Sequence, residues 1–285
     1  MRIELINTGS ELLHGRVLNT HQEWLGQQLV AAGYELNHQQ TVSDTGAAIQ
    51  AAVSEEIARS ELVIVTGGLG PTSDDITRQR IAELLDTPLE EHTRTRDHIT
   101  AFFRKLKRPM PEAVLVQAQV PAGAIVLPNH HGTAPGLAMR TLKGWLIMLP
   151  GPPRELRPMY TDSVAPLLAE KMPPKNPVHI RTLKTMGIGE SSVEERISNP
   201  LADLLDAGLE IGYCARMGEV DVRLVAHGDG ADKMLDGAES IVQEHVGDFI
   251  YGRGDDQLEE VMVRELAKRG MTLVVAESCT GGFLA

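Results

Sequence analysis

Apolar residues in the first part of the chain alternate between short β-branched runs and runs with helical spacing. The short runs predict strands over Ile3–Thr8, Tyr34–Val42 and Leu62–Val65. The stretches between them predict helices over Asn19–Ala32 and Gly46–Arg59. This β-α-β-α order predicts an α/β fold with a parallel sheet and right-handed crossovers. Because ligands of such sheets bind at the carboxyl ends of the strands, the turns after these strands should share one edge.

Polar residues mark where the helices should begin and end. Asn19 is placed to cap the first helix, and Gly33 follows its last turn, where glycine is favoured. Asp44 stands where the N-cap of the next helix is expected. Two more helices are predicted over Ile76–Leu85 and Leu89–Lys107, the second with acidic residues at its front and basic residues at its back.

The middle of the chain predicts three further short strands, over Ala124–Leu127, Leu137–Arg140 and Trp145–Leu149. Pro153 suits the first turn of a following helix. The proline-rich stretch Pro173–Pro177 cannot continue a helix and predicts a linker.

Beyond the linker the pattern changes to β-α-α-β-β-α. The predicted elements are strand 178–185, helix 190–198, helical turn 201–206, strands 209–215 and 219–226, and helix 231–246. This order fits a small split-βαβ or KH-like α+β module. A KH domain that binds nucleic acid uses a Gly-x-x-Gly loop, and Asn199-Pro200 stands there instead. We therefore expect a scaffold module rather than an RNA-binding one.

The last part of the chain predicts an amphipathic helix over Gln257–Gly270 and a strand over Thr272–Ala276 that leads into a glycine turn. A single strand and turn cannot bury themselves, so we expect the beginning of a further domain here. The predicted domains are residues 1–172, 173–254 and 255–285.

Composition narrows the class of protein. Of the 285 residues, 42% are hydrophobic, which is ample for a core, and the formal net charge is −12. An acidic chain is not expected to bind nucleic acid directly or to lie on an anionic membrane. Cys214 and Cys279 give no disulfide framework, and no run approaches the ~18 apolar residues of a membrane span. We expect a cytoplasmic protein, and a homodimer as the commonest soluble oligomer.

The stretch Thr66–Thr77 joins a predicted strand to a predicted helix through a glycine-rich turn. Glycines let backbone N–H groups approach an anion closely, and a helix N-terminus adds partial positive charge, so the turn suits phosphate. It is not a Walker A loop, because no lysine follows the glycines, and its glycine spacing is not that of a dinucleotide fingerprint.

Asp74 and Asp75 follow those glycines and have two interpretations. They could cap the helix, since Thr72-x-x-Asp75 fits a loose capping box. They could instead hold a divalent metal ion that bridges to phosphate. The pair His130-His131 has no further ligand at zinc spacing and is expected to be an ordinary loop.

Several of these turns carry motifs that together resemble the CinA family, competence/damage-inducible protein A. The motifs are Thr8–Gly15, Asn19-Thr20, Val42–Asp44, Thr66–Thr77, Gln117-Ala118, Asn129 with Gly132–Gly136, Leu149–Glu155, Gly187–Glu190, Gly218–Arg223 and Ala276–Gly282. The resemblance implies a MogA/MoaB-like (molybdopterin-binding-like) first domain with a parallel or mixed sheet. It also implies a KH-like second domain and the start of a nicotinamide-nucleotide amidase domain.

The resemblance further implies that the first domain hydrolyses ADP-ribose or a related nucleotide diphosphate with a divalent metal ion, Mg²⁺, Mn²⁺ or Co²⁺. The implied catalytic residues are Asp44 and Asp75, and the implied metal ligands are Asp74 and Asp75. The residues implied to bind the nucleotide substrate are Gly9, Glu11, Gly67, Gly68, Gly70, Thr72, Asn129, Gly132, Thr133 and Gly151. The alternative is a non-catalytic module that binds a molybdopterin or a nucleotide.

Ser278 is the nucleophile that the resemblance implies for the amidase motif. Only the first strand and turn of that domain are expected within this sequence. We therefore expect no deamidation of nicotinamide mononucleotide by this chain.

Overall fold

The computed structural model describes residues 1–282, so residues 283–285 of the predicted third segment lie outside it. The chain forms two compact units, Met1–Pro177 and the residues from Val178 onward. The division falls at the end of the predicted linker Pro173–Pro177. No helix among the described residues is long and apolar enough to cross a membrane.

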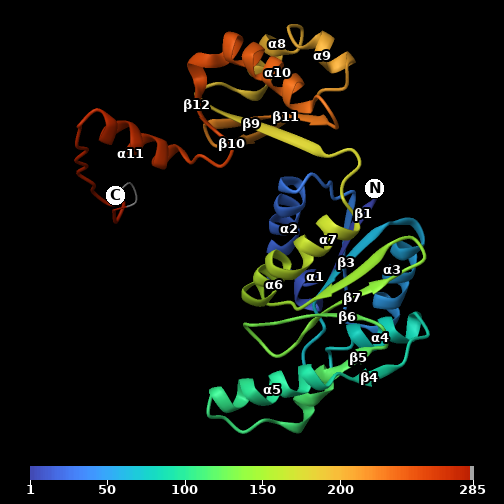
Figure 1. Cartoon of the computed structure of the whole chain (residues 1–285). Helices are drawn as coiled ribbons and strands as arrows, with labels where there is room; N and C mark the ends of the chain where they lie inside the picture. The colour runs from blue at the N-terminus through green and yellow to red at the C-terminus, as the bar shows by residue number, and fades with distance from the viewer. Residues whose placement is uncertain (283–285) are drawn as a thin grey trace. The chain divides into compact units, whose positions relative to one another are not determined.

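The first unit is built on a six-stranded mixed sheet (Figure 1). Its strands, in spatial order, are β2 (His38–Val42), β1 (Ile3–Thr8), β3 (Leu62–Thr66), β8 (Trp145–Leu149), β7 (Gly136–Arg140) and β6 (Ile125–Leu127). The first four are parallel, whereas β7 and β6 are antiparallel to their neighbours. The predicted α/β fold class with a parallel or mixed sheet is confirmed.

Helices cover both faces of this sheet, which explains why β1, β3 and β8 are buried on both sides. On one face lie α2 (Thr20–Ala31), α6 (Pro153–Met159), a π-helical turn over Tyr160–Val164, and α7 (Ala165–Lys171). On the other face lie α3 (Gly46–Arg59) and α4 (Thr77–Leu84).

A smaller lobe of the first unit contains elements that the sequence pattern did not resolve. The predicted helix Leu89–Lys107 is wrong at its start. Residues 89–91 form the strand β4 (Leu89–Glu91), which pairs with β5 (Gln119–Pro121), and the helix α5 spans Thr93–Lys105. His92 caps it by accepting the Thr95 N–H at 3.3 Å. A 3₁₀ helix over Glu112–Ala118 completes the lobe.

Two further local predictions need correction. The predicted strand Tyr34–Val42 is shorter, because only His38–Val42 pairs with β1, while Tyr34 is buried in the core. Asp44 does not cap α3. The N-cap position is Thr45, which has no capping hydrogen bond, and Asp44 accepts the backbone N–H of Ser10 instead. Asn19 does cap α2, as predicted, by accepting the His21 N–H.

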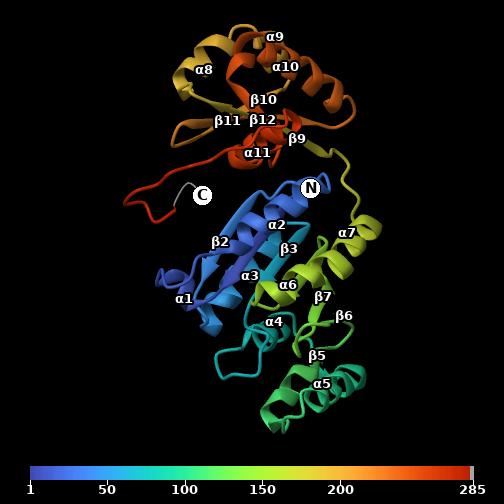
Figure 2. The same ribbon diagram turned by 90° about the vertical axis from the view of Figure 1, so that its left-hand side faces the viewer.

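The second unit is an α+β module in which helices pack on a four-stranded antiparallel sheet (Figures 1 and 2). The strands, in spatial order, are β10 (Glu210–Arg216), β11 (Glu219–His227), β9 (Val178–Met186) and β12 (Ile250–Arg253). The helices are α8 (Glu190–Ile197), α9 (Ala202–Asp206) and α10 (Ala231–Val246), with a 3₁₀ turn over Gly247–Phe249. The predicted β-α-α-β-β-α order is confirmed.

The end of the described chain contains α11 (Leu258–Lys268) but no strand at Thr272–Ala276. That prediction is wrong because a strand needs a neighbour to satisfy its backbone groups, and within residues 1–282 this segment pairs with none. Ser278 is exposed, with its hydroxyl 3.7 Å from the Cys279 sulfur.

Candidate functional site

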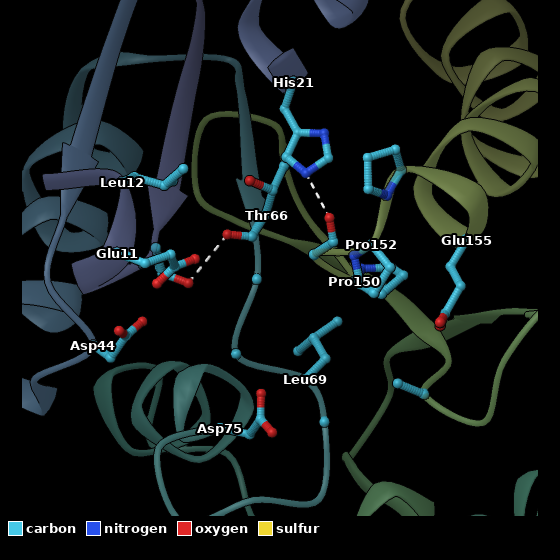
Figure 3. Close-up of a pocket in the computed structure, with 18 of the residues that line it drawn as sticks. Glu11, Leu12, His21, Asp44, Thr66, Leu69, Asp75, Pro150, Pro152 and Glu155 are labelled. Atoms are coloured by element: carbon cyan, nitrogen blue, oxygen red, sulfur yellow. Dashed lines mark hydrogen bonds between the residues drawn. The ribbon is translucent and has the colours of Figure 1, made fainter. Parts of the chain in front are cut away.

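A cavity of about 520 Å³ opens at the carboxyl ends of β1, β2, β3 and β8. The turns that follow these four strands all contribute to its lining, as expected for a parallel sheet. Figure 3 shows Glu11 and Asp44 on one side of the cavity, Glu155 on the opposite side, and Asp75 between them in this view.

The glycine-rich turn after β3 forms the centre of the cavity wall. Gly67 and Gly68 have left-handed φ values of 97° and 67°, which favour glycine. The Gly67 N–H binds the Leu149 carbonyl at 2.9 Å and so fixes the turn to β8. The N–H groups of Gly68, Leu69 and Gly70 donate to no other residue in the described range. They are available to bind the oxygens of an anion.

The carbonyl of Leu69 is held by two side chains, the fully buried Arg78 and Gln117 in the cavity lining. Arg78 Nη1 donates to it at 3.4 Å, and Gln117 Nε2 donates at 3.5 Å. Because the C=O and N–H of a trans peptide point in opposite directions, this contact turns the Gly70 N–H away from the interior. Arg78 is fully buried, and burial lowers its pKa to about 10 against an opposing influence of Asp75.

Asp74 and Asp75 lie in a turn that precedes α4 rather than in its first helical turn. Asp75 Oδ2 accepts the Thr72 backbone N–H at 2.9 Å and the Thr72 hydroxyl. Asp74 is exposed, and the Thr72 side chain beside it lowers its pKa. Part of the capping interpretation therefore holds for the Thr72–Asp75 turn, but these residues do not cap α4. Both carboxylates line the cavity.

Asp44, which follows β2, and Glu11, which follows β1, line the same side of the cavity. Asp44 Oδ2 accepts the Ser10 N–H at 2.8 Å, and the Asp44 N–H lies 3.4 Å from the Ser10 hydroxyl oxygen. This reciprocal contact joins the two turns and orients the Asp44 carboxylate beside Glu11 (Figure 3).

Glu155, which the sequence reasoning missed as a site residue, faces the cavity from the start of α6. It is only 8% exposed. Asn129 holds it by donating from Nδ2 to Glu155 Oε2 at 2.8 Å and to the Ala134 carbonyl at the same distance. A side chain at Gly132 would collide with the Glu155 carboxylate. Asn129 and Gly132 therefore act behind the wall, outside the lining, as does Thr72.

Most of the residues that the resemblance implied for the site line this cavity. The cavity is lined by Gly9, Glu11, Asp44, Gly67, Gly68, Gly70, Asp74, Asp75, Thr133 and Gly151. His21, Gln117 and Glu155 also line it without having been predicted. Gln117 and Glu155 stand inside motifs that carried the resemblance, so this signal could have identified them. His21 had no signal beyond its place in the first turn of α2.

His21 fastens α2 to the turn after β8. Its Nε2–H donates to the Gly151 carbonyl at 2.6 Å (Figure 3). Burial lowers the pKa of His21 below its usual 6.5, and the nearby Arg157 charge lowers it further, while the bond to Gly151 opposes them. The neutral imidazole is thus the form that the folded protein favours.

We expect His21 to make the first unit less stable as the pH falls. Below about pH 6.5 the unfolded chain takes up a proton that folded His21 resists, so stability present above that pH is lost on acidification. His21→Gln keeps a donor for Gly151 but does not titrate. Urea unfolding at pH 7.5 and 5.5 should show a smaller pH dependence for this variant than for the native chain. Equal pH dependences would contradict the expectation.

The cavity lining has an unusual charge pattern. Five carboxylates contribute to it: Glu11, Asp44, Asp74, Asp75 and Glu155. No lysine or arginine among residues 1–282 lines it. Carboxylate oxygens are the donors that Mg²⁺, Mn²⁺ and similar hard cations use, so the chemistry of this lining suits a divalent metal ion. These carboxylates are spread around the cavity: among residues 1–282, the group of three ligand atoms that lie within 4.8 Å of one another is elsewhere, at Glu4, His38 and Glu56.

Glu4, His38 and Glu56 form another cluster of possible metal ligands, at the amino ends of β1 and β2. Arginine side chains already bind its carboxylates. Arg59 binds both carboxylates, and Arg2 binds Glu4. Burial opposes ionisation of Glu4, but hydrogen bonds from Glu56, Arg2 and Arg59 outweigh it and lower the Glu4 pKa to about 2. The two carboxylates of this cluster therefore already have positively charged partners, Arg2 and Arg59.

Comparison with known proteins identifies both units. Residues 4–170 match the model described as "Probable molybdopterin binding domain", and residues 180–252 match the model described as "Damage-inducible protein CinA KH domain". Over the whole chain, the sequence is 40% identical to a CinA-like protein of Akkermansia muciniphila and 40% identical to one of Kosmotoga olearia. The chain covers 67% and 69% of those two proteins.

A solved structure adds the same identification. The crystal structure of the protein CinA with unknown function from Thermoplasma acidophilum is 28% identical, with a TM-score of 0.53, and the match covers 58% of this chain and 97% of that one. These findings confirm the MogA/MoaB-like fold and the KH-like module implied by the sequence motifs. The chain belongs to the CinA family.

Proposed function

We propose that the first unit hydrolyses the pyrophosphate of ADP-ribose or a related nucleotide diphosphate in a reaction that depends on a divalent metal ion. The observation that carries this proposal is the pairing of free backbone N–H groups with five carboxylates in one cavity. The N–H groups suit phosphate oxygens, whereas the carboxylates would repel them. A divalent cation between carboxylate and phosphate removes that conflict.

Different residues of the cavity would have different roles in this hydrolysis. The N–H groups of Gly68, Leu69 and Gly70 would bind non-bridging oxygens of the pyrophosphate. Asp74 and Asp75 would hold the metal ion, which when bound neutralises phosphate charge and activates water. Asp44, fixed by Ser10, would orient the attacking water and accept its proton. Attack at one phosphorus and cleavage of its bond to the bridging oxygen yields AMP and ribose 5-phosphate from ADP-ribose.

The test is hydrolysis of ADP-ribose by the purified chain in Mg²⁺, Mn²⁺ or Co²⁺, with the products separated by chromatography. We expect AMP and ribose 5-phosphate in equal amounts, and a fall of at least about 100-fold when the metal is chelated. Absence of product above a metal-only blank with all three metals would overturn the proposal. If ligand still bound in that case, the non-catalytic pterin- or nucleotide-binding alternative would be supported.

A further inference from the structure

A second cavity of about 370 Å³ adjoins the first. Thr133 lines both cavities, so the wall between them is one residue wide at that point. The rest of the partition is the loop from Asn129 to Pro135. Asn129 lines the second cavity while its side chain holds Glu155 in the first. The two cavities therefore meet at Thr133, and the inference below depends on a ligand extending past this residue from the first cavity into the second.

The partition is held in place from both sides. His98, in α5, donates from Nε2 to the Gly132 carbonyl at 3.0 Å. Asn129 Oδ1 accepts the His131 N–H at 3.0 Å, and its Nδ2 binds the Ala134 carbonyl. The loop is thus tied to α5 and closed on itself, which gives the second cavity a preformed wall.

The second cavity has the opposite chemistry from the first. No carboxylate among the described residues lines it, and Arg94 and three histidines do: His92, His98 and His130. The side chains of Arg94 and His130 have no hydrogen bond or ion pair with any of residues 1–282. His92 uses Nδ1 for its capping contacts, which leaves Nε2 available. The cavity therefore offers several unused donors and one unpaired positive charge.

The apolar part of the lining is formed by Ala124, Val126, Pro128 and Pro135, and Thr95 and Thr133 add two hydroxyl groups. Apolar walls with a few convergent polar groups are typical of sites for planar organic ligands. An arginine guanidinium and imidazole rings stack on heteroaromatic faces and donate to ring nitrogens.

We propose that this second cavity binds the nucleobase end of the substrate, a purine ring, while the pyrophosphate lies on the Gly68–Gly70 amides. This inference rests on the proposed function for the identity of the whole substrate. Binding of the base alone is nevertheless a separate property, because the second cavity contains no carboxylate that would require a metal ion.

Adjacent residues of β6 supply a matched pair of variants. Val126 lines the second cavity, whereas Ile125 points to the other face of the strand and is 41% exposed. Val126→Phe should fill the cavity and weaken binding of adenosine, measured by calorimetry without metal, by about tenfold or more. Ile125→Phe should leave that affinity within about twofold. Both variants should bind Mg²⁺-pyrophosphate like the native chain, because that ligand uses the first cavity.

A second variant, at a surface residue, tests the same cavity without changing the packing of the core. Arg94→Ser removes an exposed, unpaired side chain and should weaken adenosine binding several-fold without lowering the melting temperature. Arg104→Ser, at the far end of α5, is its control. If the native chain turns over ADP-ribose, Val126→Phe should raise KM about tenfold with little change in kcat.

The outcomes separate this inference from the proposed function. The native chain could fail to hydrolyse ADP-ribose and still bind adenosine, with Val126→Phe losing that binding. This result would support the base site and overturn the enzymatic proposal. Hydrolysis with equal adenosine affinity in the native chain, Val126→Phe and Arg94→Ser would overturn the base site alone. Absence of adenosine binding to the folded native chain would also overturn it.

Discussion

Asp75→Asn is expected to lower ADP-ribose turnover by about 100-fold or more while leaving the fold intact. The asparagine side-chain oxygen can still accept the Thr72 N–H that Asp75 accepts now, so the turn should keep its shape. What the substitution removes is the negative charge that a divalent cation requires. The loss should therefore be accompanied by a higher metal concentration at half-maximal activity.

The measurement is a metal titration of the initial rate at saturating substrate, with the native chain and two variants. Asp162→Asn makes the same change in charge at an exposed residue outside the cavity and should stay within about twofold of the native rate. A native rate and metal dependence in Asp75→Asn would show that Asp75 only shapes the turn. A large loss in kcat with unchanged metal dependence would assign it to water or phosphate instead.

The parallel part of the fold follows from local pattern. The apolar runs of β1, β3 and β8 are buried on both faces, so their composition alone distinguishes them from half-exposed strands. Their order in space is a different matter. β8 comes late in the chain and yet pairs with β3, a contact between segments about eighty residues apart that no local pattern encodes.

The wrong predictions arise where the outcome depends on a partner distant in sequence, either because one is present or because one is missing. Asp44 is a good N-cap by sequence, but the Ser10 N–H, 34 positions earlier, takes its carboxylate. Residues 89–91 were assigned to a helix and pair instead with residues 119–121. The apolar segment 272–276 has strand composition but finds no strand to pair with among the described residues.

The candidate site also contains residues that the local sequence predicts and residues whose roles depend on tertiary contacts. Turn residues such as Gly67 and Asp75 follow a strand directly, so the rule for parallel sheets predicts their edge. Glu155 and Arg78 belong to helices, and their roles depend on contacts with Asn129, 26 residues away from Glu155, and with the Leu69 carbonyl in the preceding turn. Polar residues that act through tertiary contacts leave no periodic signal, and the structure is needed to find them.

Gly67→Ala is expected to destabilise the first unit by about 2–4 kcal/mol and to abolish turnover. The added Cβ would lie 2.6 Å from the Thr8 hydroxyl oxygen and 2.7 Å from the Thr8 carbonyl oxygen. Thr8 belongs to β1, which pairs with strands on both sides and cannot move away. The residue would also keep a φ of 97°, which disfavours any side chain.

Tryptophan fluorescence during urea unfolding measures this effect without interference from the second unit, because both tryptophans of the chain, Trp24 and Trp145, lie in the first unit. Gly151→Ala is the matched control. Its backbone is not left-handed, and its added Cβ would meet only the Cα of Gly67, at 3.7 Å. We expect it to stay within about 0.5 kcal/mol of the native chain. Equal unfolding midpoints for the two variants would contradict the close approach of β1 and the glycine turn, on which the proposed phosphate site depends.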